Sequence, residues 1–356
     1  MFVGSDPPWF AFLIHPRDIG DLYRWPGSRL LRDNSRDEAE FVAKVHTMEP
    51  MALGEVVFGI GGPRGELITV LRLPERLLWL GGERVVAEAV AVAAARGCRV
   101  VGLGALTAPV TNAGLTLMRR LPPGITVTTG NAYTAAVARA DVVAAAATLD
   151  LRRPARVAVL GATGSVGVPA SHLLVRAGFE VTLIGRTEER LRMAFGDLAG
   201  QAHFATGPEG LRAADIVLIL TSDPSSQVTA DSVADGAIII DVAQPANIPA
   251  ERFPEFHARG IRVAAGGLVH IPGYRSTADF NLDDPTSTFA CLAETYVMAR
   301  AGIREHSVGP IAVEHAERME RIAAWHDVRP APLSLTLPVP TANDRAQSDA
   351  LEEVTP

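Results

Sequence analysis

Short apolar runs alternate with helix-forming stretches through the second half of the chain. Strands are predicted at residues 156–160, 181–184, 216–220, 237–240 and 261–264, and helices at 165–177 and 187–195. Apolar strands separated by helices are typical of a parallel sheet that is covered on both faces. The pattern therefore predicts a doubly wound α/β domain over residues 155–285.

The first 130 residues show a less regular mixture of strands and helices. Strands are expected at 10–14 and 100–103, a helix at 83–96, and two further strands at 55–60 and 66–71 around a glycine-rich loop. Two apolar runs joined by such a loop favour a β-hairpin. Residues 1–130 are therefore predicted to form a separate N-terminal α/β substrate domain.

Residues 131–150 are rich in Ala and Val, and Pro154 prevents their helix from continuing. We expect a bridging helix between the two domains within 131–154. Just before the C-terminal segment 286–330, Asp284 can cap a helix and Pro285 suits a first helical position. These residues predict a helix over 286–302. A second helix is expected over 313–325, and residues 331–356 have the composition of a disordered tail.

The composition narrows the classes of partner. The formal net charge of −7 over 356 residues argues against bulk binding to nucleic acid or to an anionic membrane. The apolar runs are too short to span a membrane, and the start of the chain lacks a signal-peptide pattern. Only two cysteines are present, Cys98 and Cys291, so a reducing cytoplasm is expected rather than a disulfide scaffold.

A glycine-rich turn follows the first strand of the second domain. Its sequence is Gly161-Ala162-Thr163-Gly164-Ser165-Val166-Gly167. The first glycine permits a tight turn, the second lets the backbone approach a pyrophosphate, and the third lets the following helix pack close to the sheet. The N–H groups at the start of that helix suit the phosphates of a dinucleotide. These features predict a Rossmann-type sheet and assign Gly161, Thr163, Gly164, Ser165, Val166 and Gly167 to cofactor binding.

The end of the second strand bears on which dinucleotide binds. An NAD site would place Asp or Glu there for the ribose diol, whereas this chain has Arg186, followed by Thr187 and Arg190. These side chains suit a 2′-phosphate, which favours NADPH as the cofactor, although a strand-end arginine can also be merely solvated. Ser222, Asp241 and Gly266 end other strands and are candidate contacts for the nicotinamide ribose; Ser and Asp are equally common as turn formers there.

Cys291 is the candidate nucleophile. It lies within the first two turns of its predicted helix, and a helix N-terminus favours the thiolate that attacks thioesters. An acyl group on this sulfur could accept a hydride and leave as an aldehyde, without a metal. A cysteine among apolar neighbours is also typical of a packed core, and from the residues alone this second interpretation is the stronger.

Two further groups would complete this chemistry. His270 is a candidate proton donor, because histidine titrates near neutral pH, although a lone histidine after a strand is more often a local hydrogen bonder. The backbone N–H groups near Gly266 and Gly267 are candidate donors to the oxyanion.

Four segments carry a resemblance to a known family. They are Thr128-Thr129-Gly130-Asn131, Leu160-Gly161-Ala162-Thr163-Gly164, Gly266-Gly267-Leu268-Val269 and Phe289-Ala290-Cys291. Through them, and over about residues 10–333, the chain resembles the long-chain fatty acyl-[acyl-carrier-protein] reductases best known from cyanobacteria. The resemblance implies that NADPH reduces a fatty acyl thioester of carrier protein or CoA to an aldehyde, with Cys291 as the acyl acceptor. The chain departs from the family at Tyr133, where the family has His, and at His270, where it has a Glu–His pair.

An acidic carrier protein would need a local positive patch on its reductase. Arginines cluster at Arg24, Arg29, Arg32 and Arg36 and again at Arg318 and Arg321, although each can simply balance nearby acids.

Two other functions stay open. One is a shikimate-dehydrogenase-like NADP oxidoreductase acting on a small hydroxy or keto acid. That family relies on a lysine, and the surroundings of Lys44, the only lysine, do not match its motif. The other is a non-catalytic NADP-binding sensor, because function depends on the site rather than the fold.

Overall fold

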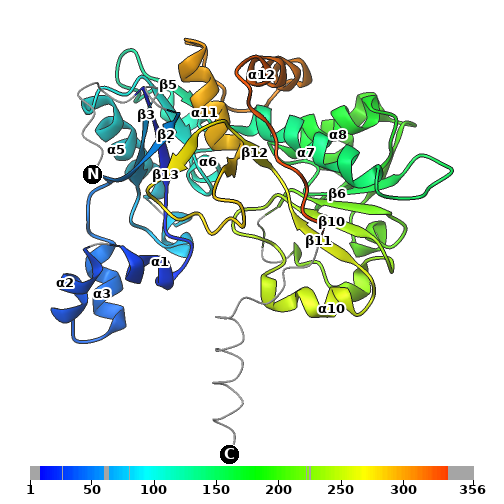
Figure 1. Ribbon diagram of the computed structural model, residues 1–356, viewed down its shortest axis with the longest axis horizontal. Coiled ribbons are helices and arrows are strands. Elements are labelled where there is room, and N and C mark those ends of the chain that lie inside the picture. Colours follow the sequence, from blue (N-terminus) through cyan, green and yellow to red (C-terminus); the bar gives the residue numbers. More distant parts are fainter. Residues whose placement is uncertain are drawn as a thin grey trace, which may run out of the picture.

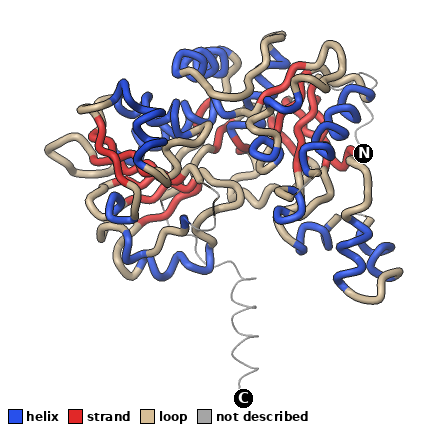
Figure 2. The backbone as a smooth tube through the Cα atoms, turned by 180° about the vertical axis from the view of Figure 1, so that it is seen from behind, coloured by secondary structure: helices blue, strands red, loops and turns tan. Residues whose placement is uncertain are grey.

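Two six-stranded sheets with helices on their faces make up most of the molecule, and one long helix joins them (Figure 1). The computed structural model describes residues 9–25, 27–59, 64–79, 81–221, 223 and 226–335. Figure 2 shows the same arrangement from behind, with the helices around the two groups of strands. This architecture confirms the α/β class expected from the sequence.

The first sheet has the strand order β13-β2-β3-β1-β4-β5. Its strands are β1 (Phe10–Ile14), β2 (Met51–Phe58), β3 (Arg64–Thr69), β4 (Val100–Leu103), β5 (Thr126–Thr128) and β13 (Tyr274–Ser276). β2 and β3 pair antiparallel, which confirms the predicted hairpin, and residues 60–63 of its loop lie outside the described residues. β1, β3, β4 and β5 are parallel, so their carboxyl ends meet at one edge.

Alternate residues of β1 separate the two faces of this sheet. Ala11 and Leu13 pack in a core with α5 (Gly82–Ala95). Phe10 and Phe12 pack in the opposite core with α11 (Ala290–Arg300). Three short helices, α1 (Ile19–Arg24), α2 (Ser28–Asp33) and α3 (Glu38–Val45), form a lobe at the lower left of Figure 1. Two short helices, α4 (Pro74–Leu77) and α6 (Thr107–Val110), follow β3 and β4.

The second sheet is parallel throughout, with the order β11-β10-β9-β6-β7-β8. Its strands are β6 (Arg156–Leu160), β7 (Glu180–Ile184), β8 (Ala202–Ala205), β9 (Ile216–Ile219), β10 (Ile238–Asp241) and β11 (Arg262–Ala265). Helices α8 (Gly167–Arg176), α9 (Glu188–Phe195) and α10 (Phe253–His257) belong to this half of the chain. The order reverses between β6 and β9, and open α/β sheets bind their ligands at such a switch point.

Helix α7 (Asn131–Ala146) bridges the two sheets, as the sequence predicts. Tyr133 and Val137 in its first half pack in the core that contains Phe10 and Phe12. Val142 in its second half packs with the second sheet. Helix α12 (Val313–Trp325) lies against α7, and its bounds match the prediction. The bridging helix therefore belongs to both cores.

Two predictions about the C-terminal third are corrected by the structure. β13, in the segment predicted for the second domain, pairs with β2 of the first sheet. The helix predicted over 286–302 begins only at Ala290, because residues 287–289 form strand β14 (Ser287–Phe289). β14 pairs with β12 (Leu268–His270), which also pairs with β15 (Arg329–Pro330). Asp284 accepts hydrogen bonds from the Thr286 N–H and the Ser287 hydroxyl and holds a turn, not a helix start.

The chain beyond Leu335 lies outside the described residues, and so does most of the predicted tail. In the part of the chain that the structure describes, no helix has the length and apolar character needed to cross a membrane.

Candidate active site

The glycine-rich turn follows β6 directly and leads into α8. Gly161 has a left-handed φ of +85°, and a Cβ there would lie 2.9 Å from Cβ of Thr221. A Cβ on Gly167 would lie 2.3 and 2.4 Å from the carbonyl oxygens of Gly161 and Ala162. Gly164 is less constrained, since its nearest neighbour would be 3.2 Å away. The first and third glycines are therefore required by the turn and by the close packing of α8.

The backbone at the start of α8 fits an anion. Among the described residues, no acceptor takes the N–H groups of Thr163, Ser165 or Val166. These groups lie between the end of β6 and the first turn of α8. Unpaired N–H groups at a helix N-terminus bind phosphates. The residues present thus fit the pyrophosphate of a dinucleotide, as the sequence predicts.

Arg186 lies after β7, at the carboxyl edge of the second sheet, and its side chain is 73% exposed. Its Nη2 is 3.7 Å from Oδ2 of Asp223. Thr187 caps α9 by accepting a hydrogen bond from the N–H of Arg190, which is also exposed. The three residues follow β7, at the strand end where a 2′-phosphate would lie. Their role in choosing NADPH stays a prediction.

Two of the three strand-end residues proposed for the nicotinamide ribose, Asp241 and Gly266, form hydrogen bonds within the protein. Asp241 accepts hydrogen bonds from the N–H groups of Ala243, Asn247 and Ile248, and burial raises its pKa to about 6. These hydrogen bonds, one to Oδ1 and two to Oδ2, hold its own loop together. The Gly266 N–H donates to the carbonyl of Asp241. Ser222 lies outside the described residues.

Cys291 is the second residue of α11 and lies beside the first turn of α7. Gly130, the N-cap of α7, has a φ of +73°, and a Cβ there would lie 2.3 Å from both Cα and Cβ of Cys291. The preceding residue, Ala290, donates its N–H to the carbonyl of Gly267, which lies just after β11. Cys291 therefore lies where the start of α7, the start of α11 and the loop after β11 meet.

Glu294 ties this junction together one helical turn after Cys291. Its carboxylate is fully buried and accepts hydrogen bonds from the Thr128 hydroxyl (2.6 Å), the Ser307 hydroxyl (2.7 Å) and the Tyr133 N–H (2.7 Å). Nε2 of His315 lies 3.0 Å from the Ser307 oxygen. A buried charge is tolerated when donors satisfy it in this way. Glu294 thereby fixes α11 against the end of β5 and the start of α7.

The sulfur environment differs from the sequence-based prediction. Cys291 is partly buried against the core of the first sheet, and burial raises its pKa to about 12. The nearby Glu294 carboxylate acts in the same direction. The expectation that the helix N-terminus favours the thiolate is therefore wrong for the protein without ligands, because loss of hydration outweighs the helix dipole. Cys98 is buried, and its pKa is also raised to about 12.

Asp141 links α7 to the loop that precedes β12. Its Oδ2 accepts a hydrogen bond of 2.7 Å from the Gly267 N–H. Burial raises the pKa of this carboxyl group to about 7. Since the N–H groups of Gly266 and Gly267 both have acceptors already, the expectation that they form the oxyanion site is also wrong. Asp141 carries no functional signal in the sequence, where it is one more polar residue in an Ala-rich helix.

His270 lies on the exposed side of β12. Its Nδ1 is 3.3 Å from the hydroxyl of Thr286, which in turn donates to Asp284. The structure thus places His270 in a surface network and gives no contact between it and Cys291. Its role as a proton donor stays a prediction.

Tyr133 stands where the long-chain fatty acyl-[acyl-carrier-protein] reductases have a histidine. Its side chain is fully packed. Only 2% of the residue is exposed, and its hydroxyl donates to the carbonyl of Val328. Burial raises the pKa of this phenol well above its usual value. The side chain therefore fills the core between α7 and the C-terminal segment.

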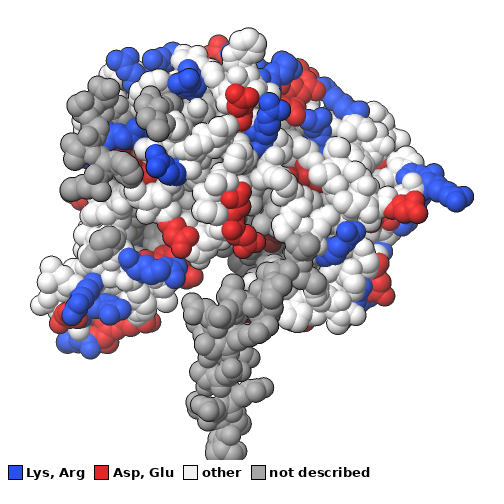
Figure 3. All heavy atoms as spheres, viewed as in Figure 1, with Lys and Arg blue, Asp and Glu red and all other residues white. Residues whose placement is uncertain are grey.

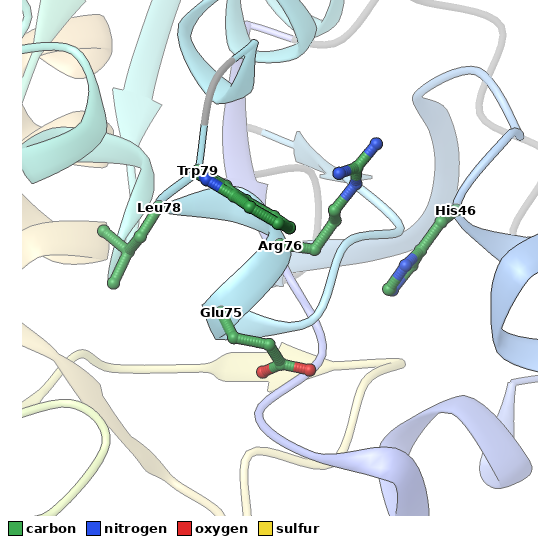
Figure 4. A pocket seen from close by; sticks show the side chains of 5 residues that line it. All are labelled: His46, Glu75, Arg76, Leu78 and Trp79. Carbon is green, nitrogen blue, oxygen red and sulfur yellow. The ribbon is translucent and has the colours of Figure 1, made fainter. Parts of the chain in front are cut away.

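A surface hollow of about 520 Å³ lies in the first domain, away from these residues (Figure 4). Leu78, Trp79, Glu75 and Arg76 line it from α4 and the residues after it, and His46 faces them from the end of α3. The residues predicted for cofactor or acyl chemistry do not line this hollow, so it does not change the assignment of the site.

The basic residues singled out in the sequence are mostly paired with acids. Arg24 pairs with Asp21, and Arg36 with Glu40. Figure 3 shows positive and negative side chains side by side in the lobe of α1–α3. Lys44 belongs to this lobe and pairs with Glu40. The lobe therefore does not present a face of one sign.

Comparison with known proteins relates part of the chain to dehydrogenases. The family model for shikimate/quinate 5-dehydrogenase matches residues 131–258, which include α7 and strands β6 to β10 but neither Lys44 nor Cys291. The bifunctional protein FolD 1 of Rhodococcus jostii is 34% identical over 115 residues, which are 32% of this chain and 33% of that protein.

A second relative matches over a longer stretch of the chain. The long-chain acyl-[acyl-carrier-protein] reductase of Synechococcus elongatus is 28% identical over 219 residues, or 58% of this chain and 63% of that protein. Among solved structures, shikimate dehydrogenase of Aquifex aeolicus is 12% identical, with 90% of this chain and 100% of that chain covered and a TM-score of 0.40. The chain thus spans a third of FolD 1 and less than two thirds of the reductase.

Proposed function

We propose that this protein is an NADPH-dependent reductase that converts a fatty acyl thioester to an aldehyde through an acyl group carried on Cys291. The observation that carries the proposal is the position of Cys291. It lies in the first turn of α11, against the start of α7. The preceding residue, Ala290, donates its N–H to Gly267 in the loop after β11. The 28% identity to a long-chain acyl-[acyl-carrier-protein] reductase supports the same substrate class.

The first step is acyl transfer to the chain. The sulfur of Cys291 attacks the thioester carbonyl and forms a new carbon–sulfur bond. The bond to the sulfur of the carrier protein or CoA breaks, and the proton of Cys291 moves to that departing sulfur. A thiol whose pKa is raised to about 12 stays protonated near neutral pH. It therefore reacts only where a substrate is held against it.

The second step releases the aldehyde. NADPH, when bound at the glycine-rich turn, would supply the hydride that reduces the acyl carbon. The bond to Cys291 breaks, and the sulfur takes up one proton. The turn from Gly161 to Gly167 would hold the pyrophosphate, and Arg186, Thr187 and Arg190 would hold the 2′-phosphate.

The shikimate-dehydrogenase-like alternative relies on a lysine, and this chain has none where α7, α11 and the loop after β11 meet. The only lysine of the chain, Lys44, lies in the last turn of α3 and pairs with Glu40 within the α1–α3 lobe. This placement favours the thioester chemistry over reduction of a small keto acid.

The test is NADPH oxidation with acyl-CoA and acyl-carrier protein of several chain lengths, with the aldehyde trapped and identified. Cys291→Ala should abolish turnover and leave NADPH binding intact, whereas the matched variant Cys98→Ala should retain turnover if it folds. Turnover by Cys291→Ala would contradict the acyl-cysteine route. Binding of NADPH without turnover on any acyl donor would favour a sensor instead.

The cofactor preference has its own test. Arg186→Ala should weaken NADPH binding about 10-fold and leave NADH binding unchanged, because only NADPH carries the 2′-phosphate. Arg192→Ala is the matched control: Arg192 is an exposed arginine of α9 that pairs with Glu188, and its loss should alter neither. Equal effects on the two dinucleotides would overturn the choice of NADPH.

A further inference from the structure

The proposed acyl transfer places negative charge on the carbonyl oxygen, and that oxygen needs donors near Cys291. The N–H groups of Gly266 and Gly267 are engaged with Asp241 and Asp141. The donors must therefore come from another element that touches Cys291, and the start of α7 is such an element.

Three of the four residues that open α7 have their N–H groups occupied. The Gly130 N–H donates to the Thr128 hydroxyl, and the Tyr133 N–H donates to Glu294. The Asn131 N–H reaches the Thr129 hydroxyl over 3.4 Å. Among the described residues no acceptor takes the N–H of Ala132, which belongs to a fully buried residue.

The side chain of Asn131 adds a second donor without a partner. Asn131 is only 8% exposed, and its Nδ2 is fully enclosed with no hydrogen-bond partner. A buried amide nitrogen left unpaired destabilises the folded protein, so its presence needs a reason. Asn131 directly follows Gly130, whose missing Cβ leaves room for Cys291.

We infer that Asn131 and the N-terminus of α7 bind the carbonyl oxygen of the acyl thioester, with Nδ2 of Asn131 and the N–H of Ala132 as its donors. This inference rests on the proposed function. α7 is 16 residues long, so its N-terminus also carries the positive end of a full helix dipole toward that oxygen. Glu294 acts as a positioning residue, because it takes up the Tyr133 N–H and holds the helix start against α11.

In the step that these donors serve, the sulfur of Cys291 forms its bond to the acyl carbon and the carbonyl oxygen becomes an oxyanion. The oxyanion then collapses, the bond to the departing sulfur breaks, and the proton of Cys291 leaves with that sulfur. Donors that are unpaired beforehand and already placed lose no other hydrogen bond when the charge develops.

The experiment measures acylation alone. Wild-type protein without NADPH is mixed with palmitoyl-CoA and octanoyl-CoA, and the acyl adduct is followed over time by intact mass. Asn131→Ala should slow the adduct about 100-fold. Asn131→Leu, which keeps the volume without a donor, should slow it equally. Ser171→Ala removes another buried hydroxyl without a partner, on α8, and should change the rate less than 2-fold.

A second readout separates oxyanion binding from a structural effect. Iodoacetamide alkylates a thiol without forming an oxyanion, so the Asn131 variants should react with it at the wild-type rate. Acylation and alkylation that fall together, or acylation that is unchanged, would overturn this inference while the acyl-cysteine route stands. No adduct on the wild-type protein with either acyl-CoA would overturn the proposed function as well.

Discussion

The glycine turn and the surroundings of Cys291 are built in opposite ways. The turn is a single segment, Gly161–Gly167, whose close contacts are largely with its own carbonyl oxygens. The cysteine stands among β5, α7, α11 and the loop after β11, and the bond between Thr128 and Glu294 joins residues 166 positions apart. A cofactor turn can therefore be specified locally, whereas the proposed acyl site depends on the packing of the two domains.

This difference predicts separable effects of mutation. Changes in the glycine turn should weaken cofactor binding and leave the chemistry of the sulfur intact. Changes that crowd the contact between α7 and α11 beside Cys291 should reduce stability and acylation together, because that contact holds the domains in place.

The largest effect is expected for Gly130→Ala. The new Cβ would lie 2.3 Å from Cys291, at a φ of +73°, so the free energy of unfolding should fall by about 4 kcal/mol. Gly124→Ala is the matched control, since its φ is +79° and nothing lies within 4 Å; it should cost only about 1 kcal/mol. Urea unfolding measures both. Equal losses would show that α7 and α11 do not touch at Gly130.

A smaller effect, on the binding of NADPH, is expected for Gly167→Ala. Its Cβ would press on the carbonyl oxygens of Gly161 and Ala162 and displace the turn. The dissociation constant for NADPH should rise about 100-fold, or about 2.7 kcal/mol, while acylation of Cys291 without NADPH continues. Gly178→Ala, at the open end of α8 with a φ of +85°, should bind NADPH normally. Loss of acylation in Gly167→Ala would mean that the two regions are not independent.

The smallest effect is a pH dependence carried by Asp141. Burial raises its pKa from 3.8 to about 7, so the folded state holds the proton more tightly than the unfolded chain does. The contribution of the protonated Asp141 to the free energy of unfolding is fully present below about pH 4 and is lost as the pH rises through about 7. Asp141→Asn keeps an oxygen for the Gly267 N–H and should gain on the order of 2 kcal/mol over wild type at pH 8, with little gain at pH 4.

Asp241 provides the contrast to Asp141. Its pKa is raised to about 6, but its oxygens accept three backbone N–H groups. Asp241→Asn should therefore destabilise the protein at every pH, because an amide nitrogen would face a donor. Thermal unfolding across pH 4–8 distinguishes the two variants. A gain in stability for Asp241→Asn would contradict the hydrogen bonds described for its loop.

Local features of the molecule can be predicted from the sequence, and those that depend on tertiary contacts cannot. The glycine turn, the parallel strands of the second sheet and the bridging helix all depend on patterns within a few residues or turns. The late start of α11 was missed because strand pairing with β12 overrides the capping signal of Asp284 and Pro285. Residues 274–276 lie within the range predicted for the second domain, yet they form β13 and pair with β2, because no local signal shows which strand they pair with.

The pKa of the Cys291 thiol could not be predicted from the position of Cys291 in the sequence alone. Its place near a helix N-terminus suggested a low pKa, but burial and Glu294 raise it. The same holds for Asn131, whose unpaired amide becomes visible only when β5, α7 and α11 are assembled. Tertiary contacts, rather than sequence spacing, decide these properties.

The most direct test of the account is peptide mapping of the protein after incubation with palmitoyl-CoA in the absence of NADPH. The account predicts one palmitoyl group on the peptide that contains Cys291, none on that of Cys98, and its release as palmitaldehyde when NADPH is added. A palmitoyl group on Cys98 alone, or an adduct at Cys291 that NADPH does not discharge, would contradict it.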